Sequence, residues 1–313
     1  MRLHHLIVPF IACALTALSS ESLASPASDD ASPLFFEHAA ATRLHALAPA
    51  LARLANGTEG LVAVAVGDLR SGRAIAINGG VNLPAASTIK IPVMVEVFRQ
   101  VAQGRFTLAR TVTLLDRDRD CGSGDLCEGP WGAQYRVLDL LDAMIDDSDN
   151  TATNMLIRLV GRQNVNQTMT GLGLSQTRLG DSIRSDGDIR ELRTSADDML
   201  KLLSMIAARQ VISETSSDMM IALLAGQRHN DLLPAPLPKD LVIAHKTGTL
   251  HDTLNDVGIV ELDGAPYVIC AFTTHLSDLD DGQRFIRRAS LLTFESFRLT
   301  AQARVAAAAN ARS

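Results

Sequence analysis

The sequence predicts a mixed protein of the α/β (α+β) class, with one antiparallel five-stranded sheet, flanking helices and an inserted all-helical lobe. Three observations support this fold. Alternating, Val- and Ala-rich segments occur near both ends of the chain, helical spacing of apolar residues fills the middle, and helical spacing returns near the C-terminus. The economical arrangement is a sheet built from both ends, with terminal helices on one face and the middle inserted as a separate lobe.

The individual elements follow from local patterns. Helical spacing begins at Phe35 and stops at Asn56-Gly57, and two alternating segments joined by Ser71-Gly72 predict a hairpin. After Leu241 the spacing changes back to that of strands. In chain order we expect a helix at 35–54, strands at 61–69 and 74–77, a helix at 88–101, mostly loop at 111–135, helices at 137–145, 151–160, 164–171, 195–208 and 213–225, strands at 242–246, 257–262 and 267–273, and a helix at 283–299.

The first 24 residues predict an export signal, because a short basic start precedes an apolar run and a small-x-small cleavage site at Ser22-Leu23-Ala24. Cys13 is an alternative lipidation site, although Phe10 is a poor start for such a motif. We expect a periplasmic or secreted protein. Its α/β lobe comprises residues 25–87 and 226–313, and its helical lobe comprises residues 88–225.

Composition excludes several classes of protein. The formal net charge is -6, and the charged residues do not cluster in the sequence. The chain therefore shows no basic patch of the kind that binds nucleic acid or an anionic membrane surface. No apolar stretch is long enough for stable membrane insertion. No second Cys or His pair stands at metal-ligand spacing, so we expect neither a metal nor another cofactor. A monomer acting on a small-molecule substrate is the expectation.

Lysine is rare in this chain, with four residues against 25 arginines, yet two of the four stand in short motifs with chemical potential. Arginine carries surface charge equally well, but only lysine loses its proton when it is buried. Lys90 closes Ser87-Thr88-Ile89-Lys90, and Lys246 opens Lys246-Thr247-Gly248-Thr249. We therefore interpret Lys90 as a candidate base and Lys246 as a compact positive charge near a substrate.

The spacing of Ser87 and Lys90 at a helix start places both side chains on one face, where a lysine of lowered pKa can take the serine proton. Ser148-Asp149-Asn150 joins two predicted helices, and Lys246 to Thr249 lies at the end of a strand. Each motif alone has an ordinary structural interpretation as a helix cap, a capping cluster or a strand end. Their order and placement together favour a catalytic interpretation.

With these three motifs, the chain resembles the superfamily of class A β-lactamases and penicillin-binding proteins, and the class A branch most closely. Thr151 to Asn154 after the second motif and Asn255-Asp256-Val257 after the third add to the resemblance. It covers nearly all of the chain after residue 24. A serine hydrolase that acts on β-lactams or D-Ala-D-Ala-like amides of peptidoglycan stem peptides is implied.

The resemblance also implies roles for the matching residues. Ser87 is the acylated nucleophile, Lys90 activates it, and Ser148 passes a proton to the leaving nitrogen. Asn150 binds the acylamido group of the substrate. Lys246 orients Ser148 and attracts the substrate carboxylate together with Thr247, Gly248 and Thr249, and the N–H groups of Ser87 and Thr249 form the oxyanion hole.

One departure concerns deacylation. The Glu-x-x-Leu-Asn segment of class A enzymes is absent, and matching Leu192 to its leucine places Ile189 where the base belongs. Glu191 is the one glutamate between Ser148 and Ser213 and therefore the remaining candidate for a Glu-type base, with a solvated helix-entry residue as the alternative interpretation. A class A-type β-lactamase is the first prediction. A D,D-peptidase or penicillin-binding protein is the second, and a penicillin-binding module of slow turnover is the third.

The cysteines give a further expectation. Cys121 and Cys127 flank a short loop-like segment, and export makes a disulfide between them chemically possible. In the family this loop borders the cleft, so a bond here either stiffens the mouth of the site or only staples the loop. Cys270 lies in an apolar strand and is expected to be a buried free thiol.

Overall fold

The computed structural model describes residues 33–180, 183–185 and 191–310 of the 313-residue chain. Within this part, one antiparallel sheet has the strand order β2-β1-β9-β8-β7, and the predicted fold class is confirmed. The strands of this sheet are β1 (Leu61–Asp68), β2 (Ala74–Ile77), β7 (Ile243–Leu250), β8 (Thr253–Val260) and β9 (Tyr267–Thr274). The expected signal segment 1–24 and Cys13 lie outside the described residues.

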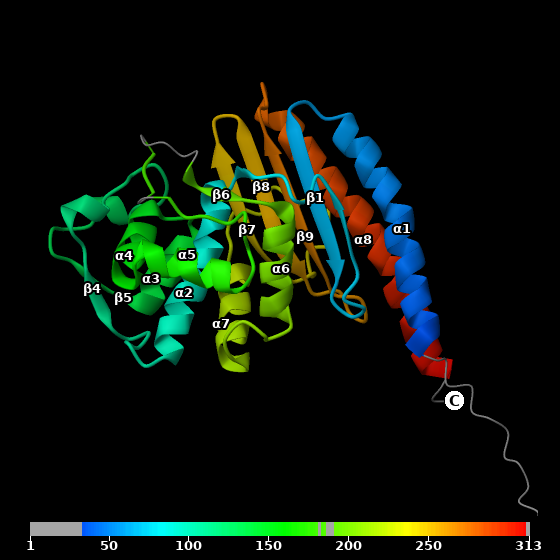
Figure 1. The fold of residues 1–313 in the computed structure, drawn as a ribbon, viewed down its shortest axis with the longest axis horizontal. Coiled ribbons are helices and arrows are strands. Elements are labelled where there is room, and N and C mark those ends of the chain that lie inside the picture. Colours follow the sequence, from blue (N-terminus) through cyan, green and yellow to red (C-terminus); the bar gives the residue numbers. More distant parts are fainter. Residues whose placement is uncertain (1–32, 181–182, 186–190, 311–313) are drawn as a thin grey trace, which may run out of the picture.

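The helices occupy both faces of the sheet and one end of the molecule (Figure 1). Helices α1 and α8 run side by side on one face, while the other helices lie on the opposite face or beyond β7. Their bounds are α1 (Pro33–Asn56), α2 (Lys90–Ala102), α3 (Val137–Asp146), α4 (Asn150–Val160), α5 (Arg162–Gly171), α6 (Ala196–Ala207), α7 (Glu214–Ala225) and α8 (Leu279–Asn310). Among them, no helix combines the length and the apolar character that a membrane span requires.

Short elements complete the described chain. They comprise two-stranded pairs and single turns of 3₁₀ helix, most of them within the segment that sequence patterns left as loop. These are β3 (Leu83–Pro84) paired with β6 (Arg193–Thr194), β4 (Thr111–Thr113) paired with β5 (Gln134–Arg136), and the turns η1 (Ala86–Ile89), η2 (Asp116–Asp118) and η3 (Leu126–Glu128).

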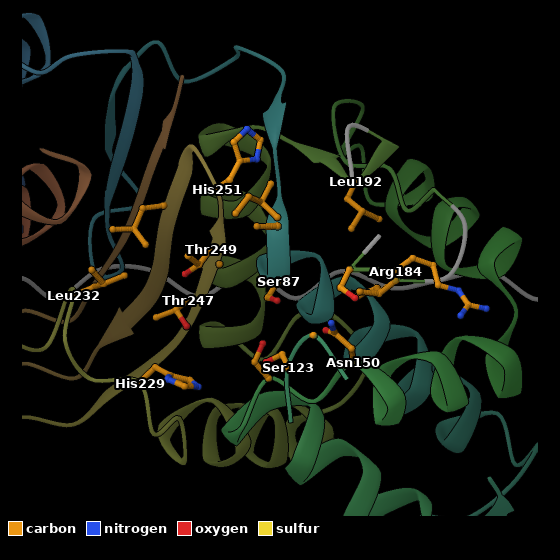
Figure 2. Close-up of a pocket in the computed structure, with 18 of the residues that line it drawn as sticks. Ser87, Ser123, Asn150, Arg184, Leu192, His229, Leu232, Thr247, Thr249 and His251 are labelled. Carbon is orange, nitrogen blue, oxygen red and sulfur yellow. The ribbon is translucent and has the colours of Figure 1, made fainter. Parts of the chain in front are cut away.

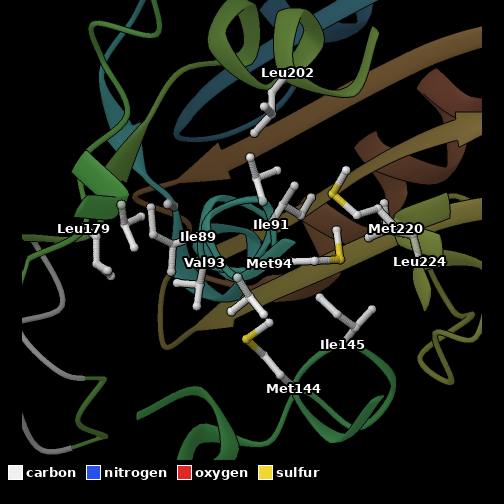
Figure 3. Packing of buried hydrophobic residues seen from close by; sticks show 14 of the residues in the cluster. Ile89, Ile91, Val93, Met94, Met144, Ile145, Leu179, Leu202, Met220 and Leu224 are labelled. Carbon is white, nitrogen blue, oxygen red and sulfur yellow. The ribbon is translucent and has the colours of Figure 1, made fainter. Parts of the chain in front are cut away.

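Two apolar cores lie on the two faces of the sheet. On β1, Val62, Val64 and Val66 belong to the core with α1 and α8, whereas Ala63 and Ala65 belong to the core that includes residues of α2 and α6. This alternation, together with burial on both faces, explains why β1 and β9 are mostly apolar. Helix α2 passes through the larger core and contacts α3, α4, α5 and α7, and Figure 3 shows part of this packing around Ile91 and Met94.

Helix α6 comes from the segment 88–225 that was expected to form the helical lobe, yet it covers the sheet on the face opposite α1 and α8 (Figure 1). Leu200 on α6 packs so closely on Gly67 of β1 that an added Cβ there would lie 2.9 Å from the Leu200 side chain. The segment therefore supplies both a cover for the sheet and the separate group of helices beyond its β7 edge.

Several element boundaries differ from the sequence expectation, among them the start of β8 and both ends of the last helix. Strand β8 begins at Thr253 rather than at residue 257, because its polar start is buried and hydrogen-bonded. The Asn255 amide donates to the carbonyls of Pro84 at 2.9 Å and Ala85 at 3.2 Å, and Asp256 accepts from the Leu233 N–H at 2.9 Å. The last helix begins four residues earlier than expected and extends to Asn310.

Candidate active site

A cavity of about 550 Å³ lies between the edge strand β7, the start of the α2 segment and the loop before α4 (Figure 2). Residues from all three motifs line it, whereas Lys90 and Lys246 are fully buried behind its surface. The residues that line it are Ala86, Ser87, Gly122, Ser123, Ser148, Asn150, Ile183, Arg184, Ser185, Leu192, His229, Asp231, Leu232, Thr247, Gly248, Thr249, Leu250, His251 and Leu254.

Ser87 stands on the turn η1, one residue after a strained backbone position. Ala86 has a φ of 47°, a left-handed conformation that a residue with a Cβ rarely adopts. The Thr88 hydroxyl fixes the turn by donating to the Ala85 carbonyl at 2.6 Å. This geometry leaves Ser87 half-buried on the cavity wall, while Lys90 begins α2 three residues later.

Lys90 is fully buried, and its amine is held by the second motif. The Nζ atom donates to the Ser148 carbonyl at 2.5 Å, to the Ser148 Oγ at 3.0 Å and to the Asn150 Oδ1 at 2.8 Å. Burial, with a further contribution from the charge of Lys246, lowers the pKa of the Lys90 amine well below its usual range. An amine with a lowered pKa is able to accept a proton near neutral pH.

In the loop between α3 and α4, the three residues Ser148, Asp149 and Asn150 have different structural roles. Asp149 takes the helix-capping role, because its carboxylate accepts the Ala152 N–H at 2.7 Å and the Leu126 N–H at 2.9 Å. Ser148 adopts a left-handed φ of 58°. Capping by Asp149 thus leaves the side chains of Ser148 and Asn150 to face the cavity and Lys90.

Strand β7 brings the third motif against the turn that carries Ser87. A Cβ placed on Gly248 would lie 3.0 Å from the Ser87 nitrogen and 3.0 Å from the Ala86 Cβ. Only glycine permits this approach without displacement of one of the two elements. Thr247 and Thr249 flank it on the cavity surface, so the strand presents a polar edge beside Ser87 (Figure 2).

Lys246 is also fully buried, with its Nζ donating to the Thr247 carbonyl at 3.2 Å. Burial lowers the pKa of Lys246 to about 7, although Asp256 and Asp146 oppose this shift. Asp256 is itself held by His245, whose Nδ1 lies 2.9 Å from the Asp256 Oδ1. The protonation state of Lys246 therefore changes within the neutral pH range.

Glu191 is placed apart from the other candidate residues. It is exposed and does not line the cavity, and its side chain lies over Gly180, where an added Cβ would meet the Glu191 Cβ at 2.5 Å. Its buried neighbour Leu192 forms the cavity wall instead. Ile189, the residue matched to the missing base, lies outside the described residues.

A second apolar residue, Ile183, lines the same wall and is fixed by Asn154 on α4. The Asn154 amide donates to the Ile183 carbonyl at 2.9 Å, and its oxygen accepts the Ile183 N–H at 2.7 Å. This paired contact resembles a short piece of sheet and anchors the segment near α4. Asn154 belongs to the segment that adds to the family resemblance, but no role was predicted for it.

The loop before the second motif is cross-linked, as the spacing of its cysteines allowed. Cys121 and Cys127 form a disulfide, while Cys270 is a buried free thiol. Inside the closed loop, the Ser123 carbonyl accepts the Asn150 N–H at 3.0 Å. The disulfide thus closes a loop that is bonded directly to the Ser148–Asn150 motif, and Gly122 and Ser123 line the cavity.

Three further polar residues near the site were not predicted as functional. His229 and His251 line the cavity, and Figure 2 shows His229 beside Thr247. Arg228, the residue before His229, is exposed and paired with Asp147 at 2.8 Å. Sequence spacing carries no signal for such residues, because their segments contact the motif only through the tertiary fold.

Comparison with known proteins agrees with this site. Residues 46–297 match the Beta-lactamase enzyme family, and the chain belongs to that family. The expectation of a hydrolase that acts on the amide bond of β-lactams is thereby confirmed at the family level. A curated relative, Beta-lactamase L2 of Stenotrophomonas maltophilia, is 29% identical over 231 residues, covering 71% of this chain and 76% of that protein.

Solved structures show the same fold. The structure of PBP-A is 30% identical with a TM-score of 0.77, covering 82% of this chain and 97% of PBP-A. A leucine-to-glutamate mutant of PBP-A, solved as an acyl-enzyme complex with penicillin G, matches to the same extent. A β-lactamase from Sphaerobacter thermophilus is 30% identical with a TM-score of 0.75, covering 81% and 97% of the two chains.

The contact at Gly248 gives a first prediction. Gly248→Ala forces β7 and the turn at Ser87 apart, so we expect a loss of about 1–3 kcal/mol in stability and a loss of about tenfold or more in acylation rate. Thermal unfolding and stopped-flow acylation by a penicillin measure the two effects. Gly171→Ala is the matched control, because nothing lies within 4 Å of its added Cβ. An unchanged acylation rate in Gly248→Ala contradicts the prediction.

Lys246 gives a second prediction. With a pKa of about 7, the amine carries its charge below that pH and loses it above, so kcat/KM for an anionic β-lactam falls as pH rises through about 7. Lys246→Arg keeps a permanent charge and moves this fall to higher pH, even if the absolute rate is lower. Lys239→Arg, at an exposed position, is expected to leave the profile unchanged. A wild-type profile that is flat from pH 6 to 9 excludes the assignment.

Proposed function

We propose that this chain is a class A-type serine β-lactamase that opens β-lactam antibiotics through an acyl-enzyme on Ser87. One observation carries the proposal. Ser87 lies on the cavity, and the buried amine of Lys90 binds both Ser148 and Asn150. Nucleophilic catalysis by serine needs a nearby base, and a buried amine of lowered pKa in a cleft can serve as that base.

In the acylation step, the Ser87 Oγ attacks the lactam carbonyl carbon while Lys90 takes the serine proton, directly or through a water molecule. The Ser148 hydroxyl, bonded to Lys90 at 3.0 Å, passes a proton to the lactam nitrogen as the C–N bond breaks. The backbone N–H groups of Ser87 and Thr249 bind the developing oxyanion. The Gly248 contact holds these two donors on neighbouring elements.

Substrate recognition uses the remaining cavity residues. The Lys246 charge, with the hydroxyls of Thr247 and Thr249, attracts the carboxylate that β-lactams carry beside their ring nitrogen. Asn150 binds the acylamido group on the opposite side of the reacting bond. These contacts orient the lactam carbonyl toward Ser87, and that orientation lowers the barrier by restricting motion before reaction.

A second candidate function is that of a D,D-peptidase or penicillin-binding protein, or a module of slow turnover, acting on D-Ala-D-Ala-like amides of peptidoglycan stem peptides. The apolar wall of Ile183 and Leu192 favours it, as does the exposed position of Glu191 outside the cavity. Neither side chain activates a water molecule. The likeness to PBP-A supports the same candidate.

For its location, we propose that residues 1–24 direct export and that the protein acts as a monomer in the periplasm or outside the cell. The Cys121–Cys127 disulfide supports this proposal, because such bonds persist in oxidising compartments. The division into an α/β lobe of residues 25–87 and 226–313 and a helical lobe of residues 88–225 remains our proposal for the domain organisation.

Covalent labelling tests the proposed function. Incubation with penicillin G is expected to add the mass of the intact drug to the peptide that contains Ser87, because β-lactam opening loses no atoms. Ser87→Ala abolishes this adduct, whereas Ser277→Ala, at an exposed residue that is bonded to Glu59 and does not line the cavity, retains it. Peptide mass spectrometry distinguishes the outcomes, and an adduct on another residue removes Ser87 from the assignment.

The lifetime of the adduct separates the two candidates. A chromogenic cephalosporin followed by stopped flow gives a burst and then a steady rate, and these report acylation and deacylation separately. Loss of the adduct within seconds supports the β-lactamase. An adduct that persists for hours supports the penicillin-binding protein.

Glu191 provides the matching mutant. Because the side chain is exposed and lies over Gly180, we expect Glu191→Gln to acylate and deacylate at wild-type rates. If Glu191 were the base of the deacylation step, Glu191→Gln would acylate normally and then stall as the acyl-enzyme. Accumulation of that intermediate in Glu191→Gln would show that Glu191 reaches the cavity during turnover.

A further inference from the structure

Asp120 is a buried carboxylate beside the site that no motif includes. It immediately precedes the disulfide loop, and only 7% of its surface is exposed. Its backbone is fixed on α4, because the Asp120 N–H donates to the Thr151 Oγ1 at 3.0 Å and its carbonyl accepts from the same hydroxyl at 3.2 Å. A carboxylate in such a position requires partners for both oxygens.

Four donors saturate this carboxylate. Oδ1 accepts the Asn150 Nδ2 at 2.8 Å and the Gly122 N–H at 3.0 Å. Oδ2 accepts the Ser185 N–H at 2.7 Å and the Ser185 hydroxyl at 3.0 Å. Although burial raises it, these hydrogen bonds hold the pKa of Asp120 below its usual range. At neutral pH the group therefore only accepts hydrogen bonds.

This acceptor decides which way the Asn150 amide faces. An asparagine amide has a donor end and an acceptor end, and rotation by half a turn exchanges them. Because Asp120 only accepts, the NH₂ end of Asn150 must face it, and the Oδ1 end then meets the Lys90 amine at 2.8 Å. One continuous path thus runs from Ser185 through Asp120 and Asn150 to Lys90.

We propose that Asp120 is a positioning residue for substrate recognition, which fixes the Asn150 amide in the orientation that binds the acylamido group of a β-lactam. The inference rests on the proposed function and deepens it, because it names the residue that determines the preference for substrates with an acylamido side chain. Asp120 also ties Ser185, on the cavity wall, to the same amide. The Asp120 carboxylate therefore positions both Ser185 on the cavity wall and the amide of Asn150.

Asp120→Asn tests this arrangement without a change of size. Whichever way the new amide turns, its NH₂ group meets a donor, either the Asn150 Nδ2 or the Ser185 N–H. Second-order acylation rate constants are measured with penicillin G, which carries the acylamido group, and with 6-aminopenicillanic acid, which lacks it. We expect the ratio of the two constants to fall about tenfold or more, as the loss of a charged hydrogen-bond partner implies.

The comparison of two substrates separates positioning from a general structural role. A merely structural aspartate lowers both constants alike and leaves their ratio unchanged, and that result overturns the inference. Asp118→Asn is the matched control, because Asp118 is also buried, in the same segment, and pairs with Arg158 at 2.8 Å. It is expected to lower the thermal midpoint and to leave the ratio unaltered.

A double-mutant cycle with Asn150→Ala adds a second criterion. If Asp120 acts through Asn150, adding Asp120→Asn to Asn150→Ala lowers the ratio no further, whereas independent effects multiply and contradict the inference. Asp120→Ser, which removes the carboxylate without adding an amide, replaces Asp120→Asn should that variant not fold. A wild-type protein without an adduct on Ser87 overturns the proposed function and this inference together. A wild-type adduct with an unchanged ratio in the variants overturns this inference alone.

Discussion

The amine of Lys90 is fully buried at the first residue of α2, a helix whose other side chains are mostly apolar. Burial of an amine is costly unless its hydrogen bonds are made, and all three acceptors come from Ser148 and Asn150. The loop between α3 and α4 must therefore turn its oxygens inward, and this requirement accounts for the left-handed Ser148 and for the capping role of Asp149.

The sheet meets this cluster through a backbone contact rather than through another side chain. Gly248 lets β7 approach the turn at Ser87, and Asn255 on the next strand holds the carbonyls just before that turn. Lys246 consequently lies near enough to Lys90 for its charge to contribute to the lowered pKa of the Lys90 amine. Both lysines are fully buried, and burial is the main cause that lowers the pKa of each amine.

Much of this arrangement was readable from residue patterns. Alternation on β1 and helical spacing on α2 reflect burial that persists over many residues, and the three motifs mark the points where functional side chains enter the cavity. Asp120 escaped notice because an aspartate in a polar loop looks like any solvated residue until Asn150 and Ser185 are seen around it. The late prediction for the start of β8 has a similar cause, since Asn255 and Asp256 look unfavourable for a strand but find buried partners.

The pairing of β1 with β9 has a consequence for how the molecule forms. Leu61 to Asp68 align with Tyr267 to Thr274, so the two central strands are separated by ~200 residues of chain. Closing so large a loop costs entropy before packing can offset it, so formation of the sheet is slow. The helical segment between the two strands is also synthesised before β9. A newly made chain therefore cannot complete its sheet until β9 is available. The same delay exposes the apolar strand β1 to association with other chains, so assembly of the sheet is the step most sensitive to protein concentration.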